Sequence, residues 1–261
     1  MTVPDIHQGT ATFWPRVLAP ADGARMLVDT NGNPQNPAAS TWMASTAYSL
    51  GQEVWDGANI EIAIIAGTSG TIQPTWPAVG SAVVDGGVTW LNLGTPYSMG
   101  ALDGPSTFEL QTKEEEVSID QEPAPVDTVM TGQSAMIEIT AKESSLAKIK
   151  LALAGSLYSS GTDTGLPSGA QAYEQIDFGG LGLPGLYAPG VGACCALISP
   201  RRGFSSPGKF MVAVLYNAYP KQPLQIGFTR TKEALYKVQF AGMANLWRTQ
   251  GKRVAQFYRQ T

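Results

Sequence analysis

The chain has 261 residues, of which 43% are hydrophobic and only 15% are charged, and its formal net charge is −4. With 29 glycines and 18 prolines, this composition argues against a helix bundle and predicts short strands joined by many turns. No apolar run approaches the ~18 residues that span a bilayer, and the opening MTVPDIHQG lacks the pattern of a signal peptide. We therefore expect a soluble protein made inside the cell.

Charge is divided unevenly along the chain. Residues 103–177 hold 13 acids and 4 bases, whereas residues 201–261 hold 11 bases and one acid, Glu233. Opposite fields attract across an interface and help to set its register. The pattern has two interpretations: a contact between copies of the chain, or pairing of the two halves within one folded subunit.

From the amino terminus, ATFWPRVLA is the first expected strand. Two segments rich in turn residues, 31–38 and 95–106, are expected to be linkers. They divide the chain into the first part of a larger domain (1–38), an inserted all-β module (39–97) and the second part of the larger domain (98–261).

Short apolar runs broken by glycine indicate the strands of the inserted module: EVW, IEIAIIAG, SAVV and VTWLNLG. Asp85 and Gly86 predict the turn of a hairpin between the last two runs.

Four of the chain's 6 tryptophans lie in this module. So small a module has little core of its own, and a buried tryptophan removes ~150–250 Å² from water. We therefore expect Trp42 and Trp90 in the core, while Trp55 and Trp76 are either packed or exposed.

After the module, TFELQTKEEEVSID (107–120) and SAMIEITAK (134–142) alternate in polarity and predict two long strands with a protruding tip between them. KESSLAKIKLALAG (142–155) has the spacing of an amphipathic helix. Residues 156–190 are rich in Gly, Ser and Pro and show no period, so they are expected to form a long loop, which is unusual in a compact domain unless it has a partner or a function.

Five further strands are expected from residue 192 onward: GACCALIS, KFMVAVLYNA, LQIGFT, ALYKVQFAGM and RVAQFYRQ. Cys194 and Cys195 are adjacent and are expected to be buried free thiols, because neighbouring side chains of a strand point to opposite faces. The fold class that accounts for the whole pattern is mainly β, an antiparallel sandwich or barrel with one flanking helix and a small inserted all-β module.

No motif for catalysis, metal or cofactor binding is present. The lone histidine, His7, has no cysteine or paired acid near it, and no G-x-S-x-G, P-loop or dinucleotide fingerprint occurs. We expect neither an enzyme nor a bound cofactor. Tyrosines and basic residues interleave after residue 216, but the same aromatics alternate as core-facing strand positions do, so specific nucleic-acid binding is not expected.

The segment EEEVSIDQEPAPVDTVMTGQSAMIEITAKESSLAKIKLALAG (114–155) resembles the major tail tube proteins of long-tailed bacteriophages, and FTRTKEALYKVQFAGMAN (228–245) is similar to that family's closing strand. The resemblance implies a β-sandwich or barrel with a flanking helix, assembled into hexameric rings. The rings would stack head-to-tail into the hollow virion tail, assembled in the host cytoplasm. The implied partners are the chain itself, other tail proteins (terminator, distal tail or baseplate, sheath) and viral DNA passing through the lumen without specific binding, with no membrane involved.

In that family the long loop between the two strands reaches the adjacent ring. The resemblance places this inter-ring loop at 117–133. The candidate contact residues in it are Asp120, Glu122, Pro123, Pro125 and Asp127. The acidic loop would dock on a basic surface of the next subunit, made of Arg201, Arg202, Lys209, Arg230 and Lys232.

The inserted module is similar to chitin-binding-type carbohydrate modules. The residues that carry the similarity are Trp42, Tyr48, Gly51, Val54, Trp90 and Gly94. This resemblance implies cell-surface glycans as partners, with Trp55 and Trp76 as the candidate glycan contacts. Two alternatives therefore accompany the tail-tube hypothesis: a carbohydrate-binding tail or adhesin component, and a tail terminator ring protein.

Overall fold

A computed structural model describes residues 11–35, 41–100, 102–117, 127–142, 146, 156–165, 169–178, 192–201, 208–221, 225–227 and 235–260. The protein is mainly β, and all ladders between its described strands are antiparallel. This confirms the predicted mainly β class. Among the described residues there is no helix long and apolar enough to cross a membrane.

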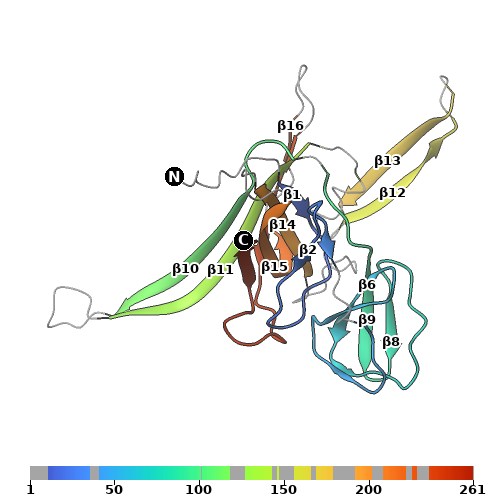
Figure 1. Cartoon of the computed structure of the whole chain (residues 1–261). Coiled ribbons are helices and arrows are strands. Elements are labelled where there is room, and N and C mark those ends of the chain that lie inside the picture. Colours follow the sequence, from blue (N-terminus) through green and yellow to red (C-terminus); the bar gives the residue numbers. More distant parts are fainter. Residues whose placement is uncertain are drawn as a thin grey trace.

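The body of the protein is an eight-stranded sheet (Figure 1). Its main path runs through β1 (Thr12–Trp14), β14 (Ala193–Arg201), β15 (Lys209–Pro220), β17 (Leu235–Gly242), β11 (Asp127–Ala141) and β10 (Thr107–Val117). Two short strands complete it: β16 (Gln225–Gly227) pairs with β17, and β18 (Ala255–Arg259) pairs with β15.

Strands β14 and β15 lie at the centre and are buried on both faces. One face packs Cys195, Leu197 and Leu215 into a cluster with residues of β11 and β17. The opposite face packs Cys194, Val214 and their neighbours against Val17, Ala19 and Met26 of the amino-terminal segment. Burial on both faces explains why these strands are continuous apolar runs rather than alternating ones. The two cysteines are free and buried, as predicted.

The sheet folds over on itself, so that β11 and β17 cover one face of β14 and β15. Ile137 and Ile139 of β11 and Phe240 of β17 are fully buried in the same cluster as Leu215. Phe13 of β1 joins them, with its ring centroid 5.0 Å from that of Phe240. This two-layered packing is the core of the body.

Two ribbons of paired strands extend away from the body (Figure 1). The first is the outer part of β10 and β11, and the second pairs β12 (Ser156–Asp163) with β13 (Gln171–Phe178). The predicted pair of long strands is confirmed, but β11 begins at Asp127, so residues 127–133 are strand and not loop as expected. The structureless loop expected over 156–190 is wrong where the chain is described, because it holds β12 and β13. The predicted helix falls outside the described residues except for Leu146.

The inserted module has its own sheet, ordered β5 (Glu53–Trp55), β6 (Ile60–Ile65), β9 (Val88–Gly94) and β8 (Ala82–Asp85). A second pair joins β4 (Ala47–Tyr48) to β7 (Gly67–Thr68), and a small hairpin of β2 (Leu27–Val28) and β3 (Pro34–Gln35) precedes the module. The β8–β9 hairpin is confirmed, with its turn at Gly86 and Gly87, one residue later than predicted. Gly86 has a φ of 61°, which a side chain would disfavour.

Module and body share a buried contact. Leu18 and Ala193 of the body form one cluster with Ile60, Leu91 and Leu93 of the module. The segment expected to be a linker after the module also joins the body, since Met99 and Leu102 are buried in its core. The expectation of a free linker over 95–106 is therefore wrong. The domain boundaries themselves stay a prediction.

A carboxylate fixes this contact. Glu53 of β5 is buried, and its two oxygens accept hydrogen bonds from the backbone N–H of Ala19 (2.7 Å) and of Cys194 (3.4 Å). On the other side, the indole N–H of Trp247 donates to the carbonyl of Gly51 (3.0 Å). These three bonds join the module to three separate segments of the body, at Ala19, Cys194 and Trp247, and fix its orientation.

We predict that Glu53→Ala lowers the free energy of unfolding by about 2–4 kcal/mol, because it leaves two buried N–H groups without acceptors. Glu53→Gln keeps one acceptor and should lower it by only about 1 kcal/mol. Urea denaturation followed by tryptophan fluorescence measures both. Equal effects of the two variants would contradict the role given to the carboxylate.

Candidate functional site

The inter-ring residues predicted from the family resemblance are placed only in part. Asp127 is exposed at the first position of β11 and pairs with Val117. Asp120, Glu122, Pro123 and Pro125 lie outside the described residues. The described chain leaves β10 at Val117 and resumes in β11 at Asp127, both at the far end of the ribbon (Figure 1).

The predicted basic docking surface is also placed in part. Arg201 ends β14 and Lys209 begins β15, and the two are direct register partners. The structure therefore brings these two positions together at one end of the central strands. Arg202, Arg230 and Lys232 lie outside the described residues.

The β10–β11 ribbon is exposed to solvent on both faces beyond the body. It carries three exposed apolar side chains, Leu110, Val129 and Met130, each about half exposed or more. Its acids are the run Glu114, Glu115 and Glu116 together with Asp127, all exposed. The ribbon therefore combines apolar groups with a concentrated negative charge.

One contact bears on the divided charge. Lys237 of β17 lies 2.9 Å from the carboxylate of Glu138 on the neighbouring strand β11. This ion pair joins the basic and the acidic segment within one subunit, at the part of β11 that belongs to the body. The acidic run on the outer ribbon, residues 114–116, forms no such pair with a described residue. Pairing within one subunit is thus observed at Lys237 and Glu138, and a contact between copies through the outer ribbon stays a prediction.

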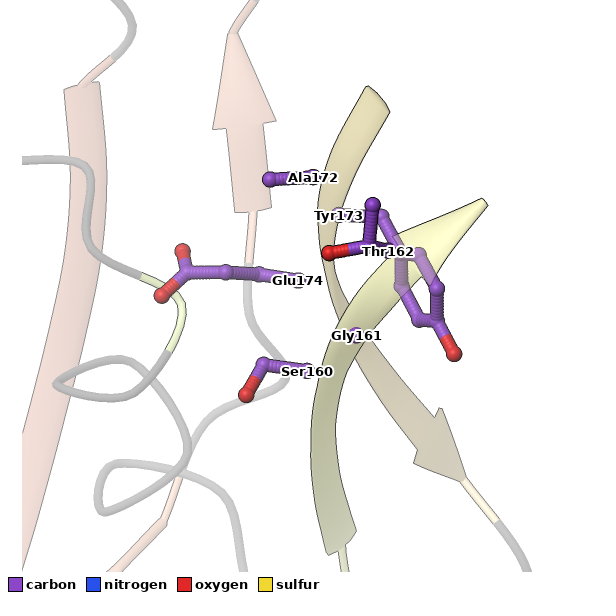
Figure 2. A pocket seen from close by; sticks show the side chains of 6 residues that line it. All are labelled: Ser160, Gly161, Thr162, Ala172, Tyr173 and Glu174. Atoms are coloured by element: carbon purple, nitrogen blue, oxygen red, sulfur yellow. The ribbon is translucent and has the colours of Figure 1, made fainter. Parts of the chain in front are cut away.

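The β12–β13 ribbon has a different surface. Tyr173 lies across from Gly161, where a Cβ would come within 2.8 Å of the phenol oxygen, so the ring covers the glycine. Figure 2 shows Ser160, Ala172 and Glu174 on one side of the ribbon and Tyr173 on the other. These residues line an open hollow rather than an enclosed pocket. The arrangement stabilises the strand pair and offers no cluster of reactive groups.

The tryptophans of the module converge on one carboxylate. Asp85 is buried and accepts hydrogen bonds from the indole N–H groups of Trp42 (2.7 Å) and Trp90 (3.1 Å) and from the backbone N–H of Gly70 (2.8 Å). Trp90 is fully buried, as predicted, and the edge of Tyr48 packs on it at 4.8 Å. Trp42 is half-buried beside this cluster.

The two candidate glycan contacts are partly buried rather than exposed. Trp76 packs edge-on against Trp90, with ring centroids 6.0 Å apart. Trp55 packs against the shared module–body cluster. The indoles do not form a common open platform, because they belong to clusters on opposite faces of the module's sheet. Glycan contact by Trp55 and Trp76 stays a prediction.

Buried ionisable groups surround the module sheet. Burial raises the pKa of Glu53 to about 7 and that of Glu61 to about 8, the latter with help from the nearby charge of Asp56. Neither oxygen of Glu61 has a hydrogen-bond partner among the described residues. No group of three or more metal-ligating side chains occurs in the described part of the chain.

Sequence patterns missed one cluster at the module–body contact. Arg248 is buried, donates a hydrogen bond to the carbonyl of Pro20, and holds its guanidinium 3.6 Å above the ring of Tyr216 and 4.7 Å from that of Trp247. The run NLWRTQGKR around it is polar and aperiodic, so it carries no periodic signal of burial. The adjacent tryptophan was its one local signal.

We predict that Asp85→Ala lowers the free energy of unfolding by about 3 kcal/mol, because one buried and two part-buried N–H donors lose their acceptor. Asp85→Asn retains one acceptor oxygen and should lower it by about half as much. Thermal unfolding followed by the near-ultraviolet circular dichroism of the indoles measures the change. As a control, Asp103→Asn removes an exposed carboxylate and should leave the transition unchanged; an unchanged transition in Asp85→Ala would contradict the assignment.

A second prediction concerns Glu61. Its pKa in the unfolded chain is near 4.5 and in the fold about 8, so the unfolded state loses its proton first as the pH rises. The carboxyl therefore favours the fold fully below pH ~4.5, and this contribution, about 4–5 kcal/mol for the full shift, is lost as the pH rises to ~8. Glu61→Gln should match the wild type near pH 5 and exceed its stability at pH 8. Parallel urea-denaturation curves at both pH values measure the difference, and a pH-independent difference would contradict it.

Comparisons with known proteins assign the chain to no family. No family model matches the sequence, and no curated protein matches it. A function for the chain therefore has to come from the placement of its own residues.

Proposed function

We propose that this chain is a structural virion protein, a subunit of a phage tail tube that assembles with copies of itself into stacked rings around the path of the genome. The observation that carries the proposal is the β10–β11 ribbon, whose outer part projects from the body with both faces exposed (Figure 1). The family resemblance of residues 114–155 includes the end of β10 and all of β11.

An isolated two-stranded ribbon is marginally stable in water, because neither face is covered. The β10–β11 ladder has eleven register pairs with one bulge. From Gln111 and Ser134 outward it is two-stranded, because β17 pairs with β11 only from Ala135 on. Leu110, Val129 and Met130 on this ladder are exposed. A second subunit that covers the ribbon would bury these side chains. Self-assembly would thus supply the cover that the exposed faces of the ribbon lack in a single subunit.

Charge gives the contact a direction. The outer ribbon carries the acids 114–116 and Asp127, and the carboxy-terminal quarter of the chain carries the bases. An acidic ribbon on one subunit and a basic surface on the next make a head-to-tail contact, which propagates into an open stack because it does not close on itself. Arg201 and Lys209, adjacent in the β14–β15 ladder, are the described part of that basic surface.

The module is compatible with this assembly as an outward decoration. In Figure 1 its sheet lies on the other side of the body from the β10–β11 ribbon, so a neighbour that covers the ribbon does not displace it. The rival hypothesis, a glycan-binding adhesin based on Trp55 and Trp76, has less support because both indoles are partly buried.

Electron microscopy of negatively stained, purified protein tests the proposal. We predict rings or hollow tubes for the wild type. The triple variant with Asp120→Lys, Glu122→Lys and Asp127→Lys should remain monomeric at the same concentration, because the reversed charges repel the basic surface. The matched charge change Asp103→Lys, outside the ribbon, should still assemble.

The complementary variant Arg201→Glu and Lys209→Glu should also fail to assemble, and mixing it with the triple variant should restore contacts between the two. Sedimentation velocity reports the assembly state, and circular dichroism verifies folding. Tubes formed normally by the triple variant would contradict the docking of the ribbon. A wild type that stays monomeric at high concentration and low salt would contradict self-assembly.

A further inference from the structure

A cleft of about 160 Å³ lies where the module meets the body. The module contributes Met43, Tyr48 and Gln52, and the body contributes Asp22 and Trp247. A cavity of about 150 Å³ is enough to hold one benzene molecule, so the cleft has room for a single six-membered ring. We propose that this cleft binds one neutral, hydroxylated ring, of the kind that a terminal sugar residue presents.

The aromatic wall of the cleft is held in place before any ligand arrives. The indole N–H of Trp247 donates to the carbonyl of Gly51 at 3.0 Å, and the guanidinium of Arg248 lies 4.7 Å from the indole. A fixed indole lowers the ordering entropy of binding, since the side chain has no rotamer freedom left to lose. It offers an apolar surface to the C–H face of a ring.

Polar groups around the same cleft have hydrogen bonds still to make. Gln52 accepts from the N–H of Ser49 through Oε1, while its Nε2 donates to no described residue. The hydroxyl of Thr41 also makes no hydrogen bond with a described residue. Asp22 is held by Thr249 through Oδ2, and these hydrogen bonds keep the pKa of its carboxyl below the usual range, so it is an ionised acceptor at the rim.

The charges of the cleft select the class of ligand. Its lining contains no lysine or arginine, so an anion has no counter-charge there. A cation would meet one ionised carboxylate, Asp22, at the exposed rim, where Oδ2 already accepts two hydrogen bonds from Thr249. Glu53 offers it little, because its oxygens already accept from Ala19 and Cys194 and its pKa is raised to about 7. A purely apolar ligand would offer no partner to the side-chain amide of Gln52, which is partly buried. A ring with one apolar face and hydroxyl groups at its edge can pack on the indole of Trp247 and hydrogen-bond to the polar groups of Gln52 and Asp22.

This inference does not rest on assembly into tubes, because all the residues concerned belong to one subunit. It also differs from glycan contact by Trp55 and Trp76, neither of which lines the cleft. The two sites are therefore separable by mutation in the same protein.

Saturation-transfer difference NMR of the full chain tests it, with glucose, galactose, N-acetylglucosamine and N-acetylgalactosamine as probes at millimolar concentration. We expect at least one sugar to receive saturation from the wild type. Asp22→Asn and Gln52→Ala should each weaken its binding by about tenfold, equivalent to one lost hydrogen bond. Thr46→Trp, which fills the cleft, should abolish the signal.

The matched controls are Trp55→Phe and Trp76→Phe, which should bind as the wild type does. Near-ultraviolet circular dichroism verifies that every variant keeps its fold, and Asp22→Asn, at an exposed position, is the variant least prone to misfolding. The inference is overturned if no sugar receives saturation, or if the cleft variants bind normally while the two tryptophan controls lose binding.

Discussion

Burial of β14 and β15 on both faces is the constraint on which the rest of the structure depends. A strand pair covered on one side only would leave Cys194, Val214 and Ile198 in water. The chain covers one face with the folded-over layer of β11 and β17, and the other with the amino-terminal segment around Val17. The segment that closes the second face continues into Leu18 and Ala19, which meet the module. The same amino-terminal segment therefore both covers the core and attaches the module to the body.

Local sequence patterns predicted the fold wherever a strand carries its own signal. The apolar runs of β14 and β15, the alternation of β10 and β11, and the glycine-broken strands of the module were all correctly assigned, because period and burial are local properties. The β12–β13 hairpin was missed because Ser, Gly and Thr dominate its first strand. Met99 and Leu102 were missed because single apolar residues in a turn-rich segment have no period.

The candidate sites were less predictable, since they depend on contacts between distant residues. The bond from Cys194 to Glu53 spans 141 positions, and the one from Trp247 to Gly51 spans 196. No local pattern distinguishes Glu53 from an exposed strand acid, yet it is buried. For the tryptophans, in contrast, burial was predicted but the hydrogen-bond acceptor was not. Their concentration in the module was correctly attributed mainly to packing, but the shared acceptor Asp85 was predicted only as a turn residue.

A fixed junction changes what the module contributes to an assembly. Because Glu53, Trp247 and the apolar cluster around Leu18 hold it, the module has one orientation on the body rather than swinging on two linkers. In a ring of identical subunits, every module would then present the same face at the same radius. Ligand groups arranged on a cell surface at matching intervals would meet many clefts at once, and weak binding by a cleft of single-ring size would be multiplied by the number of sites engaged. In such an assembly, the rigid junction would let many small clefts bind at once. A flexible tether would instead spread the clefts over many orientations and lose most of this gain in overall binding strength.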